Sequence, residues 1–376
     1  MRAILLAAGA GSRLWPYTET RPKPMVPVAG RPILDWLVEA LADAGVDEIQ
    51  VVVGYKGNRI RSFLEDGSTY DVDVSYVRQN VLLGSAAALS VALKDGGVPD
   101  EGLVMGADNI VDRDLVAALT DAGPNALATT ETRQPSKYGL VHVTGDEVDG
   151  IDEKPPIEGQ ALISTGATLL DAEVLREVPG LVDRGMLGMA NVLDHVAREG
   201  PGLHALRNPG LWLDAVYPWD LLELTAELAP HAADGSKQPG RTMGSVVVAE
   251  GATIEPGATV RGPTSIGANA RVEAGAVVNA SVIMEDVRVG AGAHVDRSVL
   301  GDGSIVRGGA TLARGEGVAE TGEDVHPLDD VGAMVGEGCT VEGAAQLLPG
   351  TLVGNRARVR AGAQARRRVD EDGEVH

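Results

Sequence analysis

The feature that most constrains the fold is an apolar residue that recurs every six positions in the last third of the chain. A six-residue period fits neither an α-helix nor a single strand. It does fit a parallel β-helix, in which each flat side contributes one inward aliphatic residue per hexapeptide. At roughly 18 residues per coil, the stretch predicts about six coils. The two series are Val248, Ile254, Val260, Ile266, Val272, Val278 and Met284, and then Val335, Val341, Leu347, Val353 and Val359. Between Leu312 and Asp330 the register is lost, and we expect an excursion from the coil there.

The first 230 residues have a different pattern, in which short apolar runs alternate with segments of helical period. This alternation predicts βαβ units and a mostly parallel sheet that is covered on both sides. Ligands of such sheets bind beyond the carboxyl ends of the strands. Ala126–Leu170 is expected to form short strands, and about Pro218–Leu228 a last helix. The expected strands are Ala3–Ala8, Ile49–Val53, Val72–Val77 and Leu103–Met105, and the expected helices are Ile33–Ala44, Asn58–Leu64, Ser85–Leu93 and Leu115–Ala122.

These patterns divide the chain into an α/β domain over 1–230, a linker over 231–245, an all-β parallel β-helix over 246–365 and a charged tail over 366–376. The formal net charge of −22 argues against nucleic acid and anionic membranes as partners. No apolar run approaches the roughly 18 residues of a membrane span. The N-terminus enters a strand without a signal-peptide pattern, so we expect a cytoplasmic protein. The single cysteine, Cys339, excludes an internal disulfide, and we interpret it as a packed thiol.

The stretch Ile4–Val28 carries the densest motif, ILLAAGAGSRLWPYTETRPKPMVPV. Its apolar run stops at the small-residue loop Gly9–Arg13. Lys23 follows between two prolines, which disfavour a helix. A loop with bare backbone N–H groups, an arginine and a stiffly held lysine suits the phosphates of a nucleotide. The glycines alone are also typical of an ordinary strand-to-helix turn, because Leu14 breaks the GxGxxG pattern.

The string from Leu6 to Ile33 resembles the signature of the sugar-1-phosphate nucleotidylyltransferases, LAAGxGxRLxPxTxxxPKPMxPVxGxPI. The hexapeptide region is similar to the left-handed β-helix often joined to these enzymes. The resemblance implies a Rossmann-like domain in which a sugar-1-phosphate oxygen attacks the α-phosphorus of a nucleoside triphosphate and pyrophosphate leaves. It also implies that Arg13 stabilises the triphosphate and the departing pyrophosphate. Lys23 would hold the α-phosphate and the incoming phosphate.

The resemblance further implies a nucleotide site at the end of the first strand. Gln79 and the turn at Gly84-Ser85 resemble the family's base-reading segment, QxxxxGTAxAL. A glutamine amide can pair with the N3–H and a carbonyl of uracil or thymine, which favours UTP or dTTP over GTP. The same pairing does not distinguish UTP from dTTP. The nucleotide-binding residues predicted in this way are Leu6, Ala8, Gly9, Gly11, Ser12, Gln79, Gly84 and Ser85.

Two aspartates resemble the family's metal ligands. Asp108 follows the apolar run Leu103–Met105, and Asp214 precedes the last helix of the α/β domain. Mg²⁺ prefers one or two carboxylates together with phosphate oxygens and waters, so we expect Mg²⁺ at these acids. Ala107 stands where the family commonly has glycine. Each acid can also be a helix N-cap or turn residue, an interpretation that suits Asp220 better than Asp214.

Three short turns resemble the family's sugar-phosphate site: Tyr138-Gly139, Glu153-Lys154-Pro155 and Thr165-Gly166. The resemblance implies that the Glu153 carboxylate receives sugar hydroxyls and that the Lys154 ammonium meets the phosphate. Without the resemblance, Glu153 and Lys154 fit an exposed ion pair in a turn equally well. Ser164 stands where asparagine is common in N-acetylglucosamine-1-phosphate enzymes, which favours glucose-1-phosphate as the substrate.

Two rival functions remain. The segment from His326 to Gly336 has the outline of the acetyl-transfer motif HxxYVGDxxIG of bifunctional relatives, but it lacks the tyrosine and has Ala333 in place of the aspartate. We therefore favour a homo-oligomer formed through the β-helix over acyl transfer. The other rival is a non-catalytic regulatory subunit. It is disfavoured because such a subunit would be free to lose Arg13, Lys23, Asp108, Asp214 or the Glu153-Lys154 pair, and all are present.

Overall fold

The computed structural model describes residues 1–232, 238–322 and 324–376. No helix in these ranges has the length and apolar character needed to cross a membrane. The chain forms two compact units, and the N-terminal motif is divided between them although it is continuous in sequence. The first unit comprises Met1–Ala10, Pro22–Met25 and Ile33–Leu213, and the second comprises Gly11–Arg21, Val26–Pro32 and Asp214–His376.

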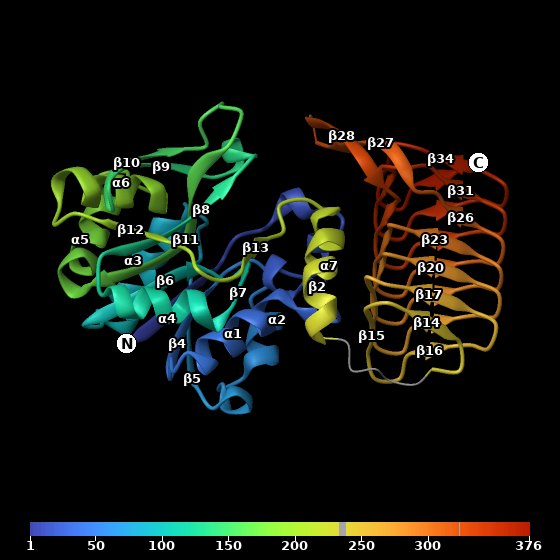
Figure 1. Cartoon of the computed structure of the whole chain (residues 1–376), viewed down its shortest axis with the longest axis horizontal. Helices are drawn as coiled ribbons and strands as arrows, with labels where there is room; N and C mark the ends of the chain where they lie inside the picture. Colours follow the sequence, from blue (N-terminus) through green and yellow to red (C-terminus); the bar gives the residue numbers. More distant parts are fainter. Residues whose placement is uncertain (233–237, 323) are drawn as a thin grey trace. The chain divides into compact units, whose positions relative to one another are not determined.

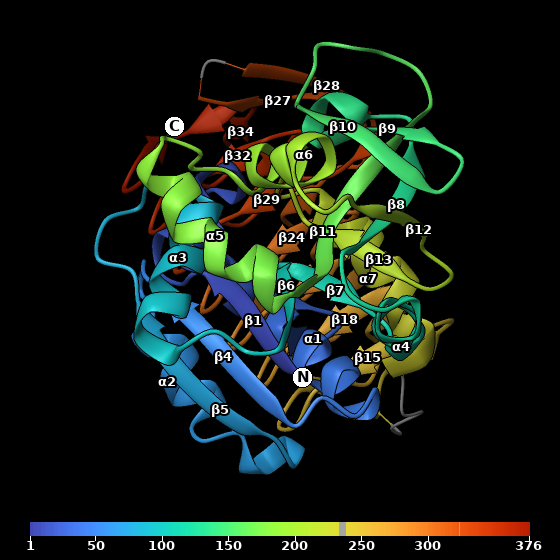
Figure 2. The same cartoon turned by 90° about the vertical axis from the view of Figure 1, so that its left-hand side faces the viewer.

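The first unit is built on one mixed sheet, in which nine strands can be traced among the described residues (Figure 2). Strands β5, β4, β1 and β6 run parallel, whereas β11 is antiparallel to both β6 and β8. The predicted mostly parallel sheet is thus found in its N-terminal half. The strand order is β5 (Asp73–Arg78), β4 (Glu48–Val53), β1 (Arg2–Ala7), β6 (Glu101–Gly106), β11 (Ala161–Asp171), β8 (Ala126–Thr132), β12 (His204–Arg207), β10 (Glu147–Glu153) and β9 (Gly139–Thr144).

Helices cover both faces of this sheet because successive residues of a central strand point to opposite sides. Leu5 of β1 packs in one core with α1 and α4, and Ile4 packs in a second core with α3, α5 and α6. Figure 2 shows α3, α5 and α6 on the face toward the viewer. The expected helices agree with α1 to α4 within a few residues, but α5 and α6 were not predicted. The helices are α1 (Ile33–Asp43), α2 (Asn58–Leu64), α3 (Ser85–Gly96), α4 (Arg113–Ala122), α5 (Ala172–Asp183) and α6 (Met189–Glu199).

The second unit contains the predicted parallel β-helix, whose three sheets each hold seven strands within the described part of the chain (Figure 1). The first sheet is β14 (Arg241–Met243), β17 (Thr259–Arg261), β20 (Val277–Asn279), β23 (His294–Asp296), β26 (Thr311–Leu312), β31 (Gln346–Leu347) and β34 (Gln364–Ala365). The second is β15 (Val246–Val248), β18 (Thr264–Ile266), β21 (Val282–Ile283), β24 (Val299–Leu300), β29 (Met334–Val335), β32 (Leu352–Val353) and β35 (Arg368–Val369). The third is β16 (Thr253–Ile254), β19 (Arg271–Val272), β22 (Arg288–Val289), β25 (Ile305–Val306), β30 (Thr340–Val341), β33 (Arg358–Val359) and β36 (Glu374–Val375).

The six-residue series forms the core of the coil, with one correction. The residues from Ile254 to Val278 in the first series, and all of the second, belong to one buried core. At the end of the first series, Ile283 pairs with Ile266 and enters this core, where Met284 had been predicted. The two isoleucines are 17 positions apart. This coil is therefore one residue shorter than the roughly 18-residue repeat.

Two segments change the expected course of the β-helix. The predicted excursion is a hairpin of β27 (Gly315–Thr321) and β28 (Asp324–Val331), across which β24 still pairs with β29. Residues 366–376, expected as a charged tail, instead provide β35 and β36. Val369 and Val375 lie six positions apart among charged residues there, and they pair with valines of the preceding coil. The spacing of these two valines continues the β-helix into residues 366–376. Strand β14 lies inside the expected linker, of which residues 233–237 are outside the described residues.

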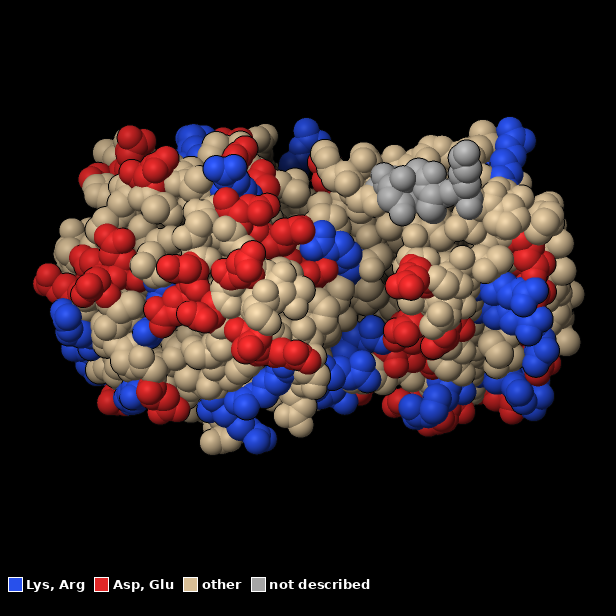
Figure 3. All heavy atoms as spheres, turned by 90° about the horizontal axis from the view of Figure 1, so that it is seen from below, with Lys and Arg blue, Asp and Glu red and all other residues tan. Residues whose placement is uncertain are grey.

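Acidic residues outnumber basic ones by 54 to 32. Figure 3 shows both signs interspersed over one face. Some of them pair between neighbouring coils of the β-helix, where Arg271 Nε lies 2.6 Å from Glu255 Oε1 and Arg356 Nη2 lies 2.7 Å from Asp372 Oδ2. Exposed pairs of this kind contribute about 0–1 kcal/mol each, so the β-helix depends mainly on its apolar core.

Candidate active site

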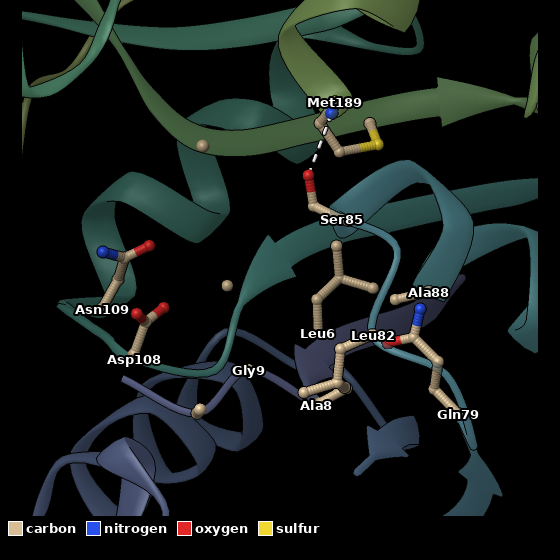
Figure 4. Close-up of a pocket in the computed structure, with 14 residues that line it drawn as sticks. Leu6, Ala8, Gly9, Gln79, Leu82, Ser85, Ala88, Asp108, Asn109 and Met189 are labelled. Atoms are coloured by element: carbon tan, nitrogen blue, oxygen red, sulfur yellow. Dashed lines mark hydrogen bonds between the residues drawn. The ribbon is translucent and has the colours of Figure 1, made fainter. Parts of the chain in front are cut away.

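A pocket of about 440 Å³ lies in the first unit at the carboxyl ends of β1 and β6, the edge at which a ligand was expected (Figure 4). Six of the predicted nucleotide-binding residues line it, together with Asp108. Their roles remain predictions, but the structure brings them to one cavity. The lining residues are Leu6, Ala8, Gly9, Ala10, Gln79, Leu82, Gly84, Ser85, Ala88, Gly106, Asp108, Asn109, Gly166 and Met189.

The turn that begins α3 is held by a segment that was not predicted to belong to the site. The backbone N–H of Ala86 donates to the carbonyl of Leu187 at 2.9 Å, and that of Met189 donates to Ser85 Oγ at 2.9 Å (Figure 4). Gly84 has φ of 132°, and a Cβ on it would lie 2.3 Å from the Leu187 oxygen. Only glycine fits there, so the turn is fixed against the start of α6.

Gln79 directly follows β5 and is 5% exposed. Its backbone N–H donates to the carbonyl of Val53 at 2.9 Å, which continues the pairing of the sheet into the pocket wall. Among the described residues, nothing in the protein accepts a hydrogen bond from its side-chain nitrogen Nε2. A buried N–H without an acceptor costs about 1–3 kcal/mol. A ligand that brings an acceptor to Nε2 would recover this energy.

Lys23 meets Asp108 with Nζ 2.7 Å from Oδ2. The lysine belongs to a single 3₁₀ turn, Lys23–Met25, in the segment where prolines were expected to disfavour a helix. Its side chain is 11% exposed, whereas that of Asp108 is 38% exposed at the pocket wall. The structure thus joins the predicted phosphate-binding cation to a predicted metal ligand.

Asp108 and Asn109 direct oxygen atoms over Gly106. A Cβ on Gly106 would lie 2.6 Å from Asp108 Oδ1 and 3.2 Å from Asn109 Oδ1, so the two oxygens converge on space that glycine leaves open. Carboxylate and amide oxygens suit Mg²⁺, which completes its shell with phosphates and waters. In the described ranges, no three His, Cys, Asp or Glu side chains converge on one point. Asn109 was not predicted as a site residue; its place beside Asp108 is the only signal in the sequence.

Three of the predicted sugar-phosphate residues, Gly139, Glu153 and Lys154, lie at one end of the β9–β10 pair. Gly139 pairs with Glu153, and the backbone N–H of Lys154 donates to the carbonyl of Tyr138 at 3.0 Å. Lys154 Nζ lies 3.1 Å from Glu153 Oε1, and both side chains are about half exposed. This ion pair is not part of the pocket lining described above.

Thr165 lies on the bulged part of β11. It is buried, its hydroxyl donates to the carbonyl of Ala128 at 2.8 Å, and its own carbonyl accepts from Trp212 Nε1 at 3.0 Å. These bonds hold the backbone, so that the next residue, Gly166, lines the pocket. The Ser164 hydroxyl accepts from the Gly166 N–H at 3.1 Å. Thr165 therefore fixes the backbone of the pocket wall without lining the pocket itself.

The remaining predicted site residues belong to the second unit. Gly11 has φ of 64° and begins the 3₁₀ turn Ser12–Leu14, which exposes Arg13. Asp214 ends β13 (Trp212–Asp214). Asp220, in contrast, is the first residue of α7 (Asp220–Ala232) and accepts hydrogen bonds from the backbone N–H groups of Val216 and Tyr217, at 2.8 and 2.7 Å. It is a turn acid, as its position indicated.

His326, the candidate acetyl-transfer base, lies on β28 in an aromatic cluster. Its ring centroid is 4.5 Å from that of Tyr217 and 5.2 Å from that of Trp219, and those two rings stack at 4.8 Å. Its Nε2 is 2.8 Å from Thr321 Oγ1. These contacts favour a packing role for the histidine.

Comparison with known proteins identifies the class. Residues 2–230 match the family model described as nucleotidyl transferase, and residues 242–332 match the GMPPB C-terminal domain. The chain therefore belongs to the nucleotidyl transferase family. Within it, the chain is a sugar-1-phosphate nucleotidyltransferase with a C-terminal β-helix, which confirms the predicted fold and class of enzyme.

Its relatives differ in nucleotide and sugar. The chain is 30% identical over 349 residues to mannose-1-phosphate guanylyltransferase 1 of Arabidopsis thaliana, covering 88% of this chain and 93% of that protein. It is 30% identical over 318 residues to glucose-1-phosphate thymidylyltransferase of Streptomyces griseus, covering 82% and 89%. A Bacillus anthracis structure assigned as a glucose-1-phosphate thymidylyltransferase, in complex with sucrose, aligns with a TM-score of 0.54 at 26% identity, covering 60% of this chain and 93% of that one.

Proposed function

We propose that the protein transfers a uridylyl or thymidylyl group from UTP or dTTP to a hexose-1-phosphate, with glucose-1-phosphate favoured, and releases pyrophosphate. The observation that carries this proposal is the buried Gln79 amide at the pocket wall. Its Nε2 can donate to a base carbonyl while its Oε1 accepts from the N3–H of uracil or thymine.

The lining near this amide supports a pyrimidine. Guanine also has an N–H beside a carbonyl, but it adds an exocyclic amino group that needs an acceptor of its own. The side chains that line the pocket near Gln79 include Leu6, Leu82 and Ala88, which offer none (Figure 4). A donor left without an acceptor there would cost about 1–3 kcal/mol.

Charge neutralisation supports the transfer step. A sugar-phosphate oxygen forms a bond to the α-phosphorus while the bond to the bridging oxygen of pyrophosphate breaks, so both reactants and the leaving group are anionic. Lys23 is rigidly held and would bind the α-phosphate, and Arg13 would bind the departing pyrophosphate. Asp108, with Asn109 beside it, would hold Mg²⁺, and Asp214 is the predicted second ligand. Mg²⁺ would neutralise phosphate charge in the complex.

The sugar subsite is proposed at the Glu153-Lys154 pair. A half-exposed carboxylate can accept hydrogen bonds from sugar hydroxyls, and the adjacent ammonium can meet the phosphate. Ser164 has its hydroxyl engaged in a local turn, which supports a sugar without an acetamido group.

Guanylyl transfer to mannose-1-phosphate is the second candidate. It is favoured by the match of residues 242–332 to the GMPPB C-terminal domain and by the similarity to a plant mannose-1-phosphate guanylyltransferase.

Homo-oligomerisation through the β-helix also stays a prediction, which light scattering of the purified chain tests.

One panel separates these functions. Pyrophosphate release is measured with UTP, dTTP, GTP and ATP against glucose-, N-acetylglucosamine- and mannose-1-phosphate, with and without acetyl-CoA. We expect the highest kcat/KM with UTP or dTTP and glucose-1-phosphate, and no consumption of acetyl-CoA. A preference for GTP and mannose-1-phosphate would replace the proposal with the second candidate.

A further inference from the structure

The loop Gly11–Arg21, called the signature loop below, belongs to the second unit together with the β-helix. Along the chain it connects Ala10, which lines the pocket, to the turn that carries Lys23. It also contains Arg13. The contacts that set the conformation of this loop therefore bear on the chemistry proposed for the enzyme.

Three polar side chains of the β-helix form a ladder at one corner of successive coils. They occupy the same position in each coil, two residues after strand residues that pair in register. Asn355 is 1% exposed and its Oδ1 accepts the backbone N–H of Glu337 at 2.7 Å, which ties neighbouring rungs together. We call Asp302, Glu337 and Asn355 the corner ladder.

Arg21 binds the two acidic rungs of this ladder. Its side chain is 8% exposed, its Nη2 lies 2.7 Å from Glu337 Oε1, and the same guanidinium contacts the Asp302 carboxylate. Burial alone would lower the pKa of Arg21, but the attraction of Asp302 and Glu337 outweighs it and raises the pKa. The guanidinium is thus held as a cation between two anions.

Other parts of the signature loop contact the same coils. Asn355 Nδ2 donates to the carbonyl of Pro16 at 3.2 Å, and the hydroxyl of Tyr17, a fully buried side chain, donates to the carbonyl of Val299 at 3.1 Å. The Arg368 guanidinium lies 4.0 Å from the centroid of the Trp15 ring. The loop is therefore fixed at several points along its length.

A hydrogen bond inside the loop connects this anchor to its catalytic end. Thr18 Oγ1 donates to the carbonyl of Gly11 at 3.0 Å, and the N–H of Leu14 donates to the same carbonyl at 2.9 Å. Arg13 lies in the turn that these bonds close. A displacement of the second half of the loop would therefore be transmitted to the arginine.

We propose that Arg21 is a positioning residue: by binding the corner ladder of the β-helix it fixes the signature loop and thereby orients Arg13 for the departing pyrophosphate. This inference rests on the proposed nucleotidyl transfer. The β-helix then contributes to catalysis without supplying a group that touches the substrate.

The test compares Arg21→Ala and Arg21→Lys with the wild type. Arg271→Ala is the matched control, because it removes an exposed arginine paired with Glu255 on another sheet of the β-helix. We expect Arg21→Ala to lower kcat by roughly 10- to 100-fold, because small misplacements of a catalytic group have effects of this size. The KM for the sugar phosphate should change much less, and Arg21→Lys should recover part of kcat. Arg271→Ala should behave as wild type.

Amide hydrogen exchange of residues 11–21 provides a readout independent of activity. We expect faster exchange in Arg21→Ala than in the wild type or the control. Wild-type exchange or an unchanged kcat in Arg21→Ala would overturn the inference. A wild-type enzyme inactive with every nucleotide would instead overturn the proposed function, while exchange still reports on the anchor. If Arg21→Ala fails to fold, Tyr17→Phe and Asn355→Ala replace it, and an unchanged kcat in both would be equally decisive.

Discussion

Lys23 and Asp108 are 85 positions apart in the sequence, and their Nζ and Oδ2 atoms lie 2.7 Å apart. The lysine holds one carboxylate oxygen, while the other is directed over Gly106 beside Asn109. The pair therefore orients the acid as well as joining two charges. An oriented carboxylate loses less conformational entropy when it binds a metal ion, which is the general advantage of preorganised ligands.

Asp108→Asn is expected to reduce Mg²⁺-dependent pyrophosphate release by at least about 100-fold, because the amide removes the negative charge that a divalent ion needs. The variant should still fold, since asparagine keeps the size of the side chain at a position that is 38% exposed. Asp114→Asn, an exposed acid in the first turn of α4, is the matched control. Asp214→Asn should have the same effect as Asp108→Asn. Turnover that survives in both site variants would reject the metal assignment.

Gln79→Glu is expected to lower kcat/KM for UTP and dTTP by roughly 10- to 100-fold, which corresponds to the loss of one buried hydrogen bond. The substitution keeps the shape of the side chain but replaces the donor Nε2 with an acceptor. Steady-state kinetics with four nucleotides measure the effect, and Asn80→Asp, which alters an exposed neighbour in the same way, serves as the control. An unchanged pyrimidine preference would remove the basis for the proposed base.

Gly84→Ala is expected to destabilise the protein by about 2–4 kcal/mol, because it combines backbone strain with a steric clash against the Leu187 carbonyl. Gly97→Ala is the matched control. Gly97 also has positive φ, 74°, but a Cβ there meets nothing within 4 Å. Urea unfolding should show a larger loss for Gly84→Ala, and the KM for the nucleotide should rise only in that variant. Equal losses would mean that the Leu187 contact has no energetic effect.

The stability of the protein is expected to fall between about pH 9 and pH 11. Burial raises the pKa of the Cys339 thiol from 9.0 to about 11. The folded state therefore favours the protonated thiol, so this stabilisation is complete below the unfolded pKa and is lost as the pH rises through the folded one. The loss should reach about 2–3 kcal/mol.

Urea unfolding at a series of pH values measures this loss, with Cys339→Ala as the control. The variant should show a shallower decline, since other groups still titrate. At pH 8 the native thiol, 1% exposed and donating to the Gly354 carbonyl at 3.0 Å, should also resist a thiol reagent until the protein is unfolded. Equal slopes with and without the cysteine would contradict the expectation.

The fold could be predicted from the sequence wherever a local pattern determines which side chains are buried. Val260 and Val278 enter the core because a hexapeptide period leaves one inward side chain on each flat side, and Ile4 and Leu5 face opposite cores because a strand alternates. The prediction for Met284 was wrong because this coil is one residue shorter than a strict six-residue period requires. The residue is missing at a corner, between two inward-facing positions, so the apolar pattern alone does not reveal it.

The parts of the site that were missed depend on contacts between distant segments. Leu187 acts through a backbone carbonyl, which no sequence motif records. Asn109 became a candidate only when Gly106 was seen to open space beside it. Arg21 looks like a surface cation in the sequence, and its partners, Asp302 and Glu337, lie about 280 and 316 positions further along the chain.

The division of the N-terminal motif between two units has a practical consequence for domain cutting. A fragment that ends at residue 230, as the family match suggests, would keep every letter of the motif. It would nevertheless lack the coils against which Trp15, Tyr17 and Arg21 are seated. In this chain a domain boundary drawn from sequence therefore separates part of the N-terminal motif from the residues that it contacts.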